Sequence, residues 1–282
     1  MKQIIISIDF SENAWNALFT ALKLYARTNC KFLLLNAYEP RAADLIGNKN
    51  KERLAVLYES MDTHANAELD KILRYLSKNH SNDLHHFEKM AVSDDLLESL
   101  MELLLKREID LIVMGTQGAS GVQGVFIGSN TVWVLRKVRN CPVLAVPESY
   151  NFQALKKVVL PTDFTRHFDP GKLQPLLELL QDWKAELMVL YLASGNQLNE
   201  EQRAVKKLLI EKLQGLHHSF YQEDLTSDLS AAFAKYAREE GADMIALVHY
   251  KHSFMEQLTR EPVISHVAFS SRIPFLVLPD VS

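Results

Sequence analysis

The sequence predicts an α/β protein built of two tandem, open, doubly wound domains, each with a parallel sheet of five strands. The chain has 282 residues, a comfortable length for two domains of roughly 140 residues each. Two pairs of similar segments recur along it, and short apolar segments alternate with segments of helical periodicity. Strands that are apolar throughout and separated by helices are typical of parallel sheets covered on both faces. We expect the domains at residues 1–150 and 151–282.

The internal repeat is carried by two segment pairs. Residues 4–11 read IIISIDFS, and residues 158–165 read VVLPTDFT, 154 positions later. Residues 140–147 read NCPVLAVP, and residues 272–279 read RIPFLVLP, 132 positions later. Because the second offset is smaller, the second copy is the shorter one, by about 154 − 132 = 22 residues.

The first copy alternates strands and helices. Expected strands lie at residues 4–8, 32–38, 84–92, 110–115 and 142–147. Ser11 is suited to cap the first helix, with Glu12 in its first turn. Apolar residues at steps of three and four predict a long helix from Leu54 to Leu76. Two further helices are expected, one capped by Ser93 and ending near residue 108, the other at residues 128–138.

The second copy follows the same order. Its expected strands lie at residues 158–162, 187–192, 220–225, 243–249 and 275–278. Its second helix, at residues 200–216, is shorter than the long helix of the first copy, which explains the missing residues. The start of its first helix stays open, because Asp169-Pro170 suits a helix start whereas Pro175 argues for a later one. In such sheets ligands bind beyond the carboxyl ends of the strands.

Composition restricts the class of protein. Hydrophobic residues make up 48% and charged residues 23%, an ordinary globular balance. The net charge of −4 argues against a protein that coats nucleic acid or an anionic membrane. Two cysteines, Cys30 and Cys141, are too few for a disulfide framework and suit small buried apolar positions. With no signal-peptide features and no apolar run near ~20 residues, we expect a cytoplasmic protein.

A glycine-rich loop is the segment whose composition indicates ligand binding. Five of the ten glycines fall between Gly115 and Gly128, between an expected strand and an expected helix. Glycine lets the backbone approach a phosphate closely, and a helix start supplies free N–H groups with a partial positive charge. The loop suits a phosphorylated ligand, although it is neither the dinucleotide fingerprint nor the Walker loop. The alternative is a flexible loop whose glycines only permit turns.

Three motifs resemble one known family. The spacing Gly115-x2-Gly118-x9-Gly128-Ser129 is similar to the nucleotide motif of ATP-binding universal stress proteins. The Asp-Phe-Ser at residues 9–11 resembles the first turn of that family, and residues 141–146 resemble its closing strand. The resemblance covers the whole chain as a tandem pair. It implies a Rossmann-like fold of the adenine-nucleotide alpha-hydrolase type.

The resemblance implies an ATP site, with Mg²⁺, in the first domain. Asp9 would lie at the base and ribose end of the pocket, with the backbone near Ala37. Met114 and Gly115 would line the ribose side. The alternative role for Asp9 is a helix-capping carboxylate, and the two roles can coexist. Gln117 stands where histidine is common in the family, which puts a specific side-chain contact there in doubt.

The phosphates would be held mainly by backbone N–H groups. The resemblance assigns this role to Gly118, Gly128, Ser129 and Asn130, with Thr131 as a weaker candidate. It leaves open whether the nucleotide is ATP, ADP or a cyclic nucleotide.

The second copy breaks the motif. With the offset of 132, residues 128–130 align with Arg260, Glu261 and Pro262. Glu261 at a helix start would repel phosphate, and Pro262 removes an N–H donor. We therefore expect no ATP binding of this kind in the second domain, where Asp163 is retained as a structural turn residue.

No catalytic or metal site is predicted. His249, His252 and His266 lie near the lost glycines, but their spacing is not a recognised zinc pattern, so surface histidines are expected. The pairs His85-His86 and His217-His218 are expected to be polar residues at strand edges. The chain has no Gly-x-Ser-x-Gly elbow, and no carboxylate pair is placed beside the glycine loop.

The leading functional hypothesis is a binding and regulatory protein of the stress response. ATP occupancy would bias residues 119–127 between two conformations that an unknown protein partner reads. One rival is a slow ATP-hydrolysing enzyme, because a positioned phosphate with a cation needs little else. Another is a structural or partner-binding stress protein that binds no nucleotide. Strands Val143–Val146 and Phe275–Leu278 are expected to pair within one chain as an internal pseudo-dimer, with a homodimer of chains as a further possibility.

Overall fold

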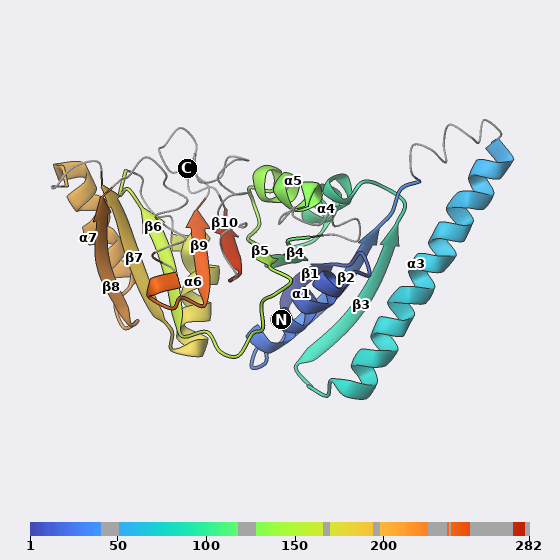
Figure 1. The fold of residues 1–282 in the computed structure, drawn as a ribbon, viewed down its shortest axis with the longest axis horizontal. Helices are drawn as coiled ribbons and strands as arrows, with labels where there is room; N and C mark the ends of the chain where they lie inside the picture. The colour runs from blue at the N-terminus through green and yellow to red at the C-terminus, as the bar shows by residue number, and fades with distance from the viewer. Residues whose placement is uncertain are drawn as a thin grey trace.

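The computed structural model describes residues 1–40, 51–117, 128–165, 170–193, 198–224, 236, 238–248 and 273–279 (Figure 1). In chain order the described strands and helices are β1 (Lys2–Ser7), α1 (Glu12–Leu24), β2 (Cys30–Ala37), α3 (Lys51–Asn79), β3 (His85–Val92), α4 (Leu96–Lys106), β4 (Leu111–Gly115), α5 (Ser129–Lys137), β5 (Val143–Val146), β6 (Lys157–Thr162), α6 (Pro170–Trp183), β7 (Glu186–Ala193), α7 (Glu200–Lys212), β8 (His218–Asp224), β9 (Met244–Val248) and β10 (Phe275–Leu278). They alternate as the sequence predicts, and strand ends differ from the expected ones by one or two residues.

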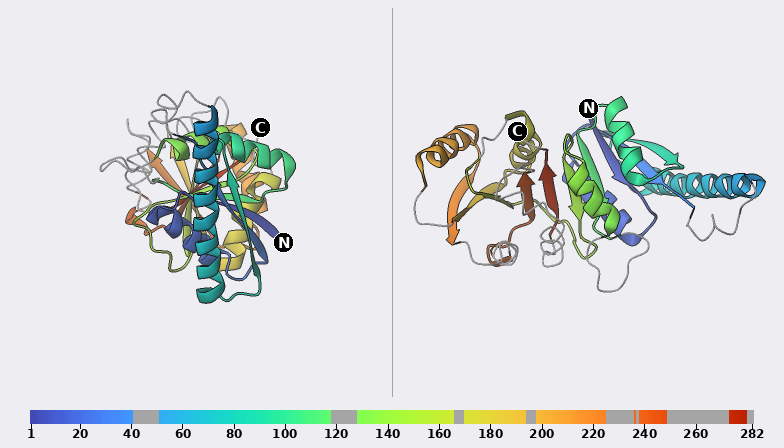
Figure 2. Two further views of the ribbon diagram at one scale, coloured as in Figure 1. Left: turned by 90° about the vertical axis from the view of Figure 1, so that its right-hand side faces the viewer. Right: turned by 90° about the horizontal axis from the view of Figure 1, so that it is seen from above.

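The strands form one ten-stranded sheet in the order β3-β2-β1-β4-β5-β10-β9-β6-β7-β8. Each half has the same order of strands, read outward from the middle of the sheet, and the strands within each half are parallel. Because parallel crossovers are right-handed, the connections from β1 to β3 and those from β3 to β5 place their helices on opposite faces. Figure 2 shows helices on both faces. The predicted doubly wound α/β fold is confirmed.

The halves join through β5 and β10, which pair antiparallel. Phe275 lies opposite Ala145, Leu276 opposite Leu144, and Val277 opposite Val143. All four residues of β5 are at most 1% exposed. The expected pairing of the two closing strands within one chain is therefore confirmed, and both of these apolar strands are covered.

The connection between the halves is held by α1. The amide nitrogen of Asn16 lies 3.0 Å from the carbonyl oxygen of Pro147 and 2.8 Å from that of Tyr150. Further along the helix, the carbonyl oxygen of Leu24 accepts a hydrogen bond from the Trp183 indole at 2.9 Å. One helix of the first half thus contacts both the connection and α6 of the second half.

The Asp-Phe-Ser/Thr turn recurs with the same geometry in both halves. The carboxylates of Asp9 and Asp163 each accept two hydrogen bonds from the Ser or Thr two residues later, at 2.6–3.1 Å. Phe10 and Phe164 both have positive φ, 63° and 54°. A left-handed conformation costs a non-glycine residue roughly 1–2 kcal/mol. Two copies of the same unfavourable turn, each after a first strand, support the internal repeat seen in the sequence.

The observed helix starts agree in part with those expected from the sequence. Ser11 caps α1, since its hydroxyl accepts from the Ala14 N–H. The predicted cap of α4 is wrong: the helix is capped by Asp95, not Ser93, because the Asp95 carboxylate accepts from the N–H groups of the second and third helical residues. Helix α6 begins at Pro170 and contains Pro175, so the earlier of the two starts left open is the observed one.

Helix α3 is longer than the sheet it covers. Its buried stripe contains Ala65, Leu69, Ile72 and Leu76. Its N-terminal part extends past the sheet (Figure 1), and Val56 there is 65% exposed. Across the described part of the chain, we find no helix with both the length and the apolar character needed to span a membrane.

Both cysteines occupy the buried apolar positions expected of them. Cys30 begins β2 and Cys141 precedes β5, and each is at most 1% exposed. Burial raises the pKa of both thiols to about 12. The thiols therefore stay protonated and unreactive near neutral pH.

One histidine differs from its expected place at a strand edge. His85 is buried, and its Nε2 lies 3.0 Å from the Tyr25 carbonyl oxygen. Its ring stacks on that of His80, whose Nε2 lies 2.9 Å from His85 Nδ1. Because a carbonyl only accepts, His85 carries its proton on Nε2 and its Nδ1 accepts from His80. The arrangement requires a neutral His85, because its Nδ1 must keep a lone pair to accept the His80 Nε2–H.

We predict that this histidine pair makes the fold sensitive to acid. Burial lowers the pKa of His80 and of His85 below the ordinary value of 6.5. The unfolded state then binds more protons, so their contribution to stability is complete above pH about 6.5 and is lost as the pH falls towards the depressed values. Urea unfolding should show that the free energy of unfolding falls less between pH 8 and pH 5.5 in the double variant His80→Gln/His85→Asn than in the wild type. An equal loss would contradict this, and His86→Asn, on the neighbouring exposed residue, is the control.

We also predict that Asn16 stabilises the fold by holding the connection between the two halves. Asn16→Ala should lower the free energy of unfolding by about 1–3 kcal/mol, since partly buried carbonyls lose their donor. Asn16→Asp should cost more, because a carboxylate would then face the carbonyls of residues 147 and 150. Chemical denaturation measures both, and equal stability of the Asp variant and wild type would count against the assigned role.

Candidate functional site

A cavity of about 90 Å³ lies at the carboxyl ends of β1 and β4. Strand β1 has β2 on one side and β4 on the other, so the strand order reverses between β1 and β4. This reversal is where open α/β sheets bind ligands. The residues that line the cavity are Ser7, Asp9, Ala14, Leu96, Met114, Gly115, Gln117, Gly128, Ser129, Asn130 and Thr131.

The fold brings most of the sequence-predicted site residues together here. Those that line the cavity are Asp9, Met114, Gly115, Gly128, Ser129 and Asn130. Ala37 is the last residue of β2, next to β1, and is not among the lining residues. Gly118 lies outside the described residues.

Asp9 reaches the cavity from a turn that it also stabilises. Its Oδ1 accepts hydrogen bonds from the N–H and the hydroxyl of Ser11, at 3.1 and 2.6 Å. The Ser11 hydroxyl oxygen in turn caps α1. Asp9 thus supports a helix cap through one oxygen while it lines the cavity, so the two roles weighed for it are compatible.

The start of α5 has the properties of an anion-binding helix terminus. Its N-cap is Gly128, which adds no side-chain hydrogen bond, and its first turn holds no acidic residue. In α4, by contrast, Asp95 occupies the N–H groups of the first turn. The first N–H groups of a helix have no partner within it and carry a partial positive charge. An anion beside Ser129 and Asn130 is therefore favoured at α5.

Gly128 itself has an ordinary backbone conformation, with φ −72° and ψ 150°. Any residue adopts this conformation, so positive φ is not the reason for glycine here. Its N–H donates to the Thr116 carbonyl oxygen at 2.6 Å, which fixes the entry into α5. A missing side chain at this point leaves the helix start open to a ligand.

Gly115 is required by the close approach of a neighbouring side chain. A Cβ at this position would lie 2.7 Å from both Cγ and Nδ2 of Asn13. Asn13 is 3% exposed, and its amide donates to the Gln117 carbonyl oxygen at 3.1 Å. The Thr131 hydroxyl donates to the Gly115 carbonyl oxygen at 2.9 Å. These bonds fix the end of β4 against the starts of α1 and α5.

Sequence reasoning missed two buried asparagines that support the site without lining its cavity. Asn13 and Asn36 are both buried, and the Asn36 amide donates to the Ile8 carbonyl oxygen at 2.7 Å. Asn36 interrupts an otherwise apolar run, which was a usable signal. Asn13 follows a helix cap, where polar residues are common, so nothing in the sequence marked it.

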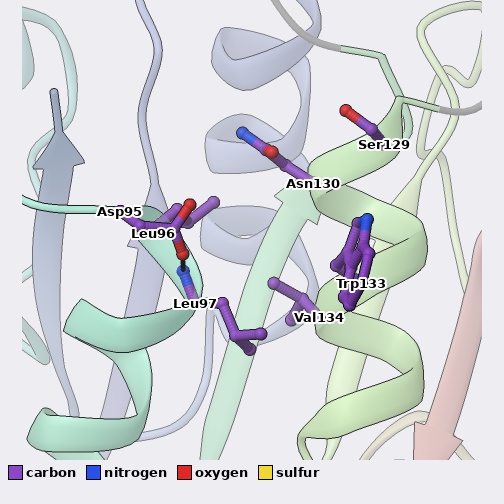
Figure 3. A pocket seen from close by; sticks show the side chains of 7 residues that line it. All are labelled: Asp95, Leu96, Leu97, Ser129, Asn130, Trp133 and Val134. Atoms are coloured by element: carbon purple, nitrogen blue, oxygen red, sulfur yellow. Dashed lines mark hydrogen bonds between the residues drawn. The ribbon is translucent and has the colours of Figure 1, made fainter. Parts of the chain in front are cut away.

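A second hollow adjoins the first. A groove of about 270 Å³ lies between α4 and α5 (Figure 3). It shares Leu96, Ser129 and Asn130 with the cavity. Asp95, Leu97, Trp133 and Val134 complete its lining, and none of them was a predicted site residue.

The second half offers no equivalent of the glycine at the end of β4. Val248 is the last residue of β9 and pairs with Leu278 as Gly115 pairs with Val146, and it is 2% exposed. Residues 260–262, which carry the predicted loss of the motif, lie outside the described residues, as do His249, His252 and His266. In the described ranges, no group of three His, Cys, Asp or Glu residues is placed to hold a metal ion.

Comparison with known proteins agrees with this geometry. The model of the universal stress protein family matches residues 1–147, just over half of the chain. The chain belongs to the universal stress protein family. No curated protein matches its sequence significantly.

Solved structures extend the likeness of this universal stress protein to its whole length. A universal stress protein from Archaeoglobus fulgidus DSM 4304 is 15% identical, with a TM-score of 0.71, over 98% of this chain and 96% of that one. A functionally unknown protein from Pseudomonas aeruginosa PAO1 is 13% identical, with a TM-score of 0.66, over 100% and 93%. At these identities the likeness shows the fold, and its extent is consistent with a tandem arrangement.

We predict that Gly115 and Asn13 are energetically coupled. Gly115→Ala should lower the free energy of unfolding by about 1–3 kcal/mol, because the added methyl group displaces Asn13. In the Asn13→Ala background the same substitution should cost much less, giving a coupling of about 0.5–3 kcal/mol in a double-mutant cycle. Denaturant unfolding of the four proteins measures it, and additive effects would show that the contact is unimportant.

Proposed function

We propose that this universal stress protein binds one ATP, with Mg²⁺, in the cavity of its first half and acts as a nucleotide-dependent regulatory protein of the stress response. The observation that carries the proposal is the cavity at the strand-order reversal, where Asp9 faces the uncapped start of α5. We further propose that residues 1–150 and 151–282 are the two domains. Cytoplasmic localisation belongs to the same proposal.

The chemistry of the lining suits a nucleotide. Asp9 supplies a carboxylate acceptor for a ribose hydroxyl or an exocyclic amine, and Met114 adds an apolar surface. The N–H groups at Ser129 and Asn130 suit phosphate oxygens. Gly118 and Ala37 complete the proposed set. Mg²⁺ keeps several waters and binds through substrate phosphates, so it needs no all-protein ligand cage.

A regulatory role is favoured over fast catalysis by what the cavity lining contains. Among the lining residues Asp9 is the ionisable one, and the proposal places its carboxylate against the ribose or the base, away from the phosphates. A general base must lie within hydrogen-bond reach of the water that attacks the phosphate. Bound nucleotide would therefore persist. A protein partner would detect it by binding the nucleotide-bound and nucleotide-free states of this protein with different affinity.

Calorimetric titration of ATP and Mg²⁺ into the nucleotide-stripped protein tests the proposal. One ATP per chain is expected. Gly128→Val should abolish the heat of binding, because its side chain blocks the helix start while its φ of −72° suits valine and preserves the fold. Asp9→Asn should weaken binding by about tenfold or more, since hydrogen bonds to a charged acceptor are worth about 1.5–3 kcal/mol.

Asp163→Asn is the matched control, because this residue makes the same turn in the second half. It should leave ATP affinity unchanged. Two sites per chain would refute the assignment to the first half alone. No heat from a folded protein would exclude ATP binding and favour a partner-binding role. Multiple-turnover phosphate release, lost in Gly128→Val, would identify a slow hydrolase instead.

A further inference from the structure

The groove between α4 and α5 is larger than the cavity it adjoins. Its volume is about 270 Å³, against about 90 Å³ for the cavity at the ends of β1 and β4. The proposed nucleotide site thus continues into a hollow that the roles given to Asp9 and Met114 do not involve. Figure 3 shows this hollow, with α4 on one side and α5 on the other.

The walls of the groove are apolar and aromatic. Leu97 projects from α4 and Val134 from α5 towards the space between the helices (Figure 3). Trp133 lines the groove and is 52% exposed, and Lys137 Nζ lies over one face of its ring, 5.7 Å from the centroid. A large aromatic side chain beside an open hollow is a stacking surface for a planar ring, since every nucleobase has a π-face.

Ser129 and Asn130 line both hollows. They are the first two residues of α5, where an anion is favoured. A phosphate chain held there would have the Asp9 side of the cavity at one end and the Trp133 side of the groove at the other.

The α4 side of the groove does not suit another phosphate. The Asp95 carboxylate oxygen accepts from the N–H groups of Leu97 and Glu98, at 2.8 and 3.3 Å. The first-turn donors of α4 are therefore used, and the charge of Asp95 repels anions. A carboxylate at this place instead suits hydroxyl or amino donors, such as those of a ribose or a base.

We propose that the site takes a dinucleoside polyphosphate, with one nucleoside in the Asp9 cavity, the phosphate chain at the start of α5, and the second base stacked on Trp133. This inference rests on the proposed function, because it assumes the same phosphate position. It extends that function by naming the ligand class: two nucleosides joined by phosphates, of which ATP occupies one end.

Titration of diadenosine tetraphosphate and of ATP, each with Mg²⁺, tests the inference. The dinucleotide should bind about 5- to 150-fold more tightly than ATP, as one stacked base contributes. Trp133→Ala should remove this difference and bring both affinities close to that of ATP. Leu105→Ala, at an 84% exposed position on α4 outside the groove, is the surface control and should keep the difference.

Fluorescence provides a second readout. The chain has three tryptophans, and Trp133 alone among them lines the groove. The dinucleotide should quench emission more than ATP does, and Trp133→Phe should lose the extra quenching while keeping part of the affinity gain. This variant retains a ring, so its behaviour does not depend on loss of fold.

The outcomes separate the two proposals. If ATP binds and the dinucleotide binds no more tightly, or if Trp133→Ala weakens both ligands equally, the inference is overturned while the proposed function stands. If neither ligand binds the folded wild-type protein, both are overturned.

Discussion

The antiparallel pairing of β5 and β10 is the contact on which the whole architecture depends. Each strand is four residues long and apolar throughout, and each would otherwise be an exposed edge of its own half. Unpaired apolar edges invite association with other chains. Pairing them with each other buries both and turns two five-strand arrays into one sheet. Fusing two copies in one chain thus makes permanent a contact that two separate chains would have to form by dimerisation.

Helix α1 links the junction between the two halves to the candidate site. Near its start, Asn13 bonds the chain just after β4. In its middle, Asn16 bonds the connection, and at its end the Leu24 carbonyl oxygen accepts from Trp183. The site and the junction therefore share one rigid element.

The site contains local conformations that are energetically unfavourable, and the packing around it compensates for them. Phe10 holds a left-handed conformation, and Gly115 leaves room for a buried asparagine within van der Waals contact. Neither feature improves the packing of an isolated sheet. Together with the start of α5, which has no side-chain cap, they place a carboxylate and a close backbone approach around one hollow. Such a concentration of strained groups is typical of binding sites.

The sequence by itself determined the strand and helix order, the repeat and most of the site. Apolar periodicity and turn residues are local signals, and the glycine spacing and the Asp-Phe-Ser turn singled out Asp9, Gly115, Gly128 and Ser129, which line one cavity in the structure. It misassigned the cap of α4, because Ser93 and Asp95 are equally good caps and packing chose between them.

Tertiary structure alone decided what depends on contacts between distant segments. Asn13 became part of the site because β4 ends against it, His85 became buried because Tyr25 and His80 pack over it, and Trp133 came to line a groove because α4 lies opposite. Each of these residues looks ordinary in the sequence. Their roles come from neighbours dozens of positions away or on another element, and local patterns carry no information about such pairs.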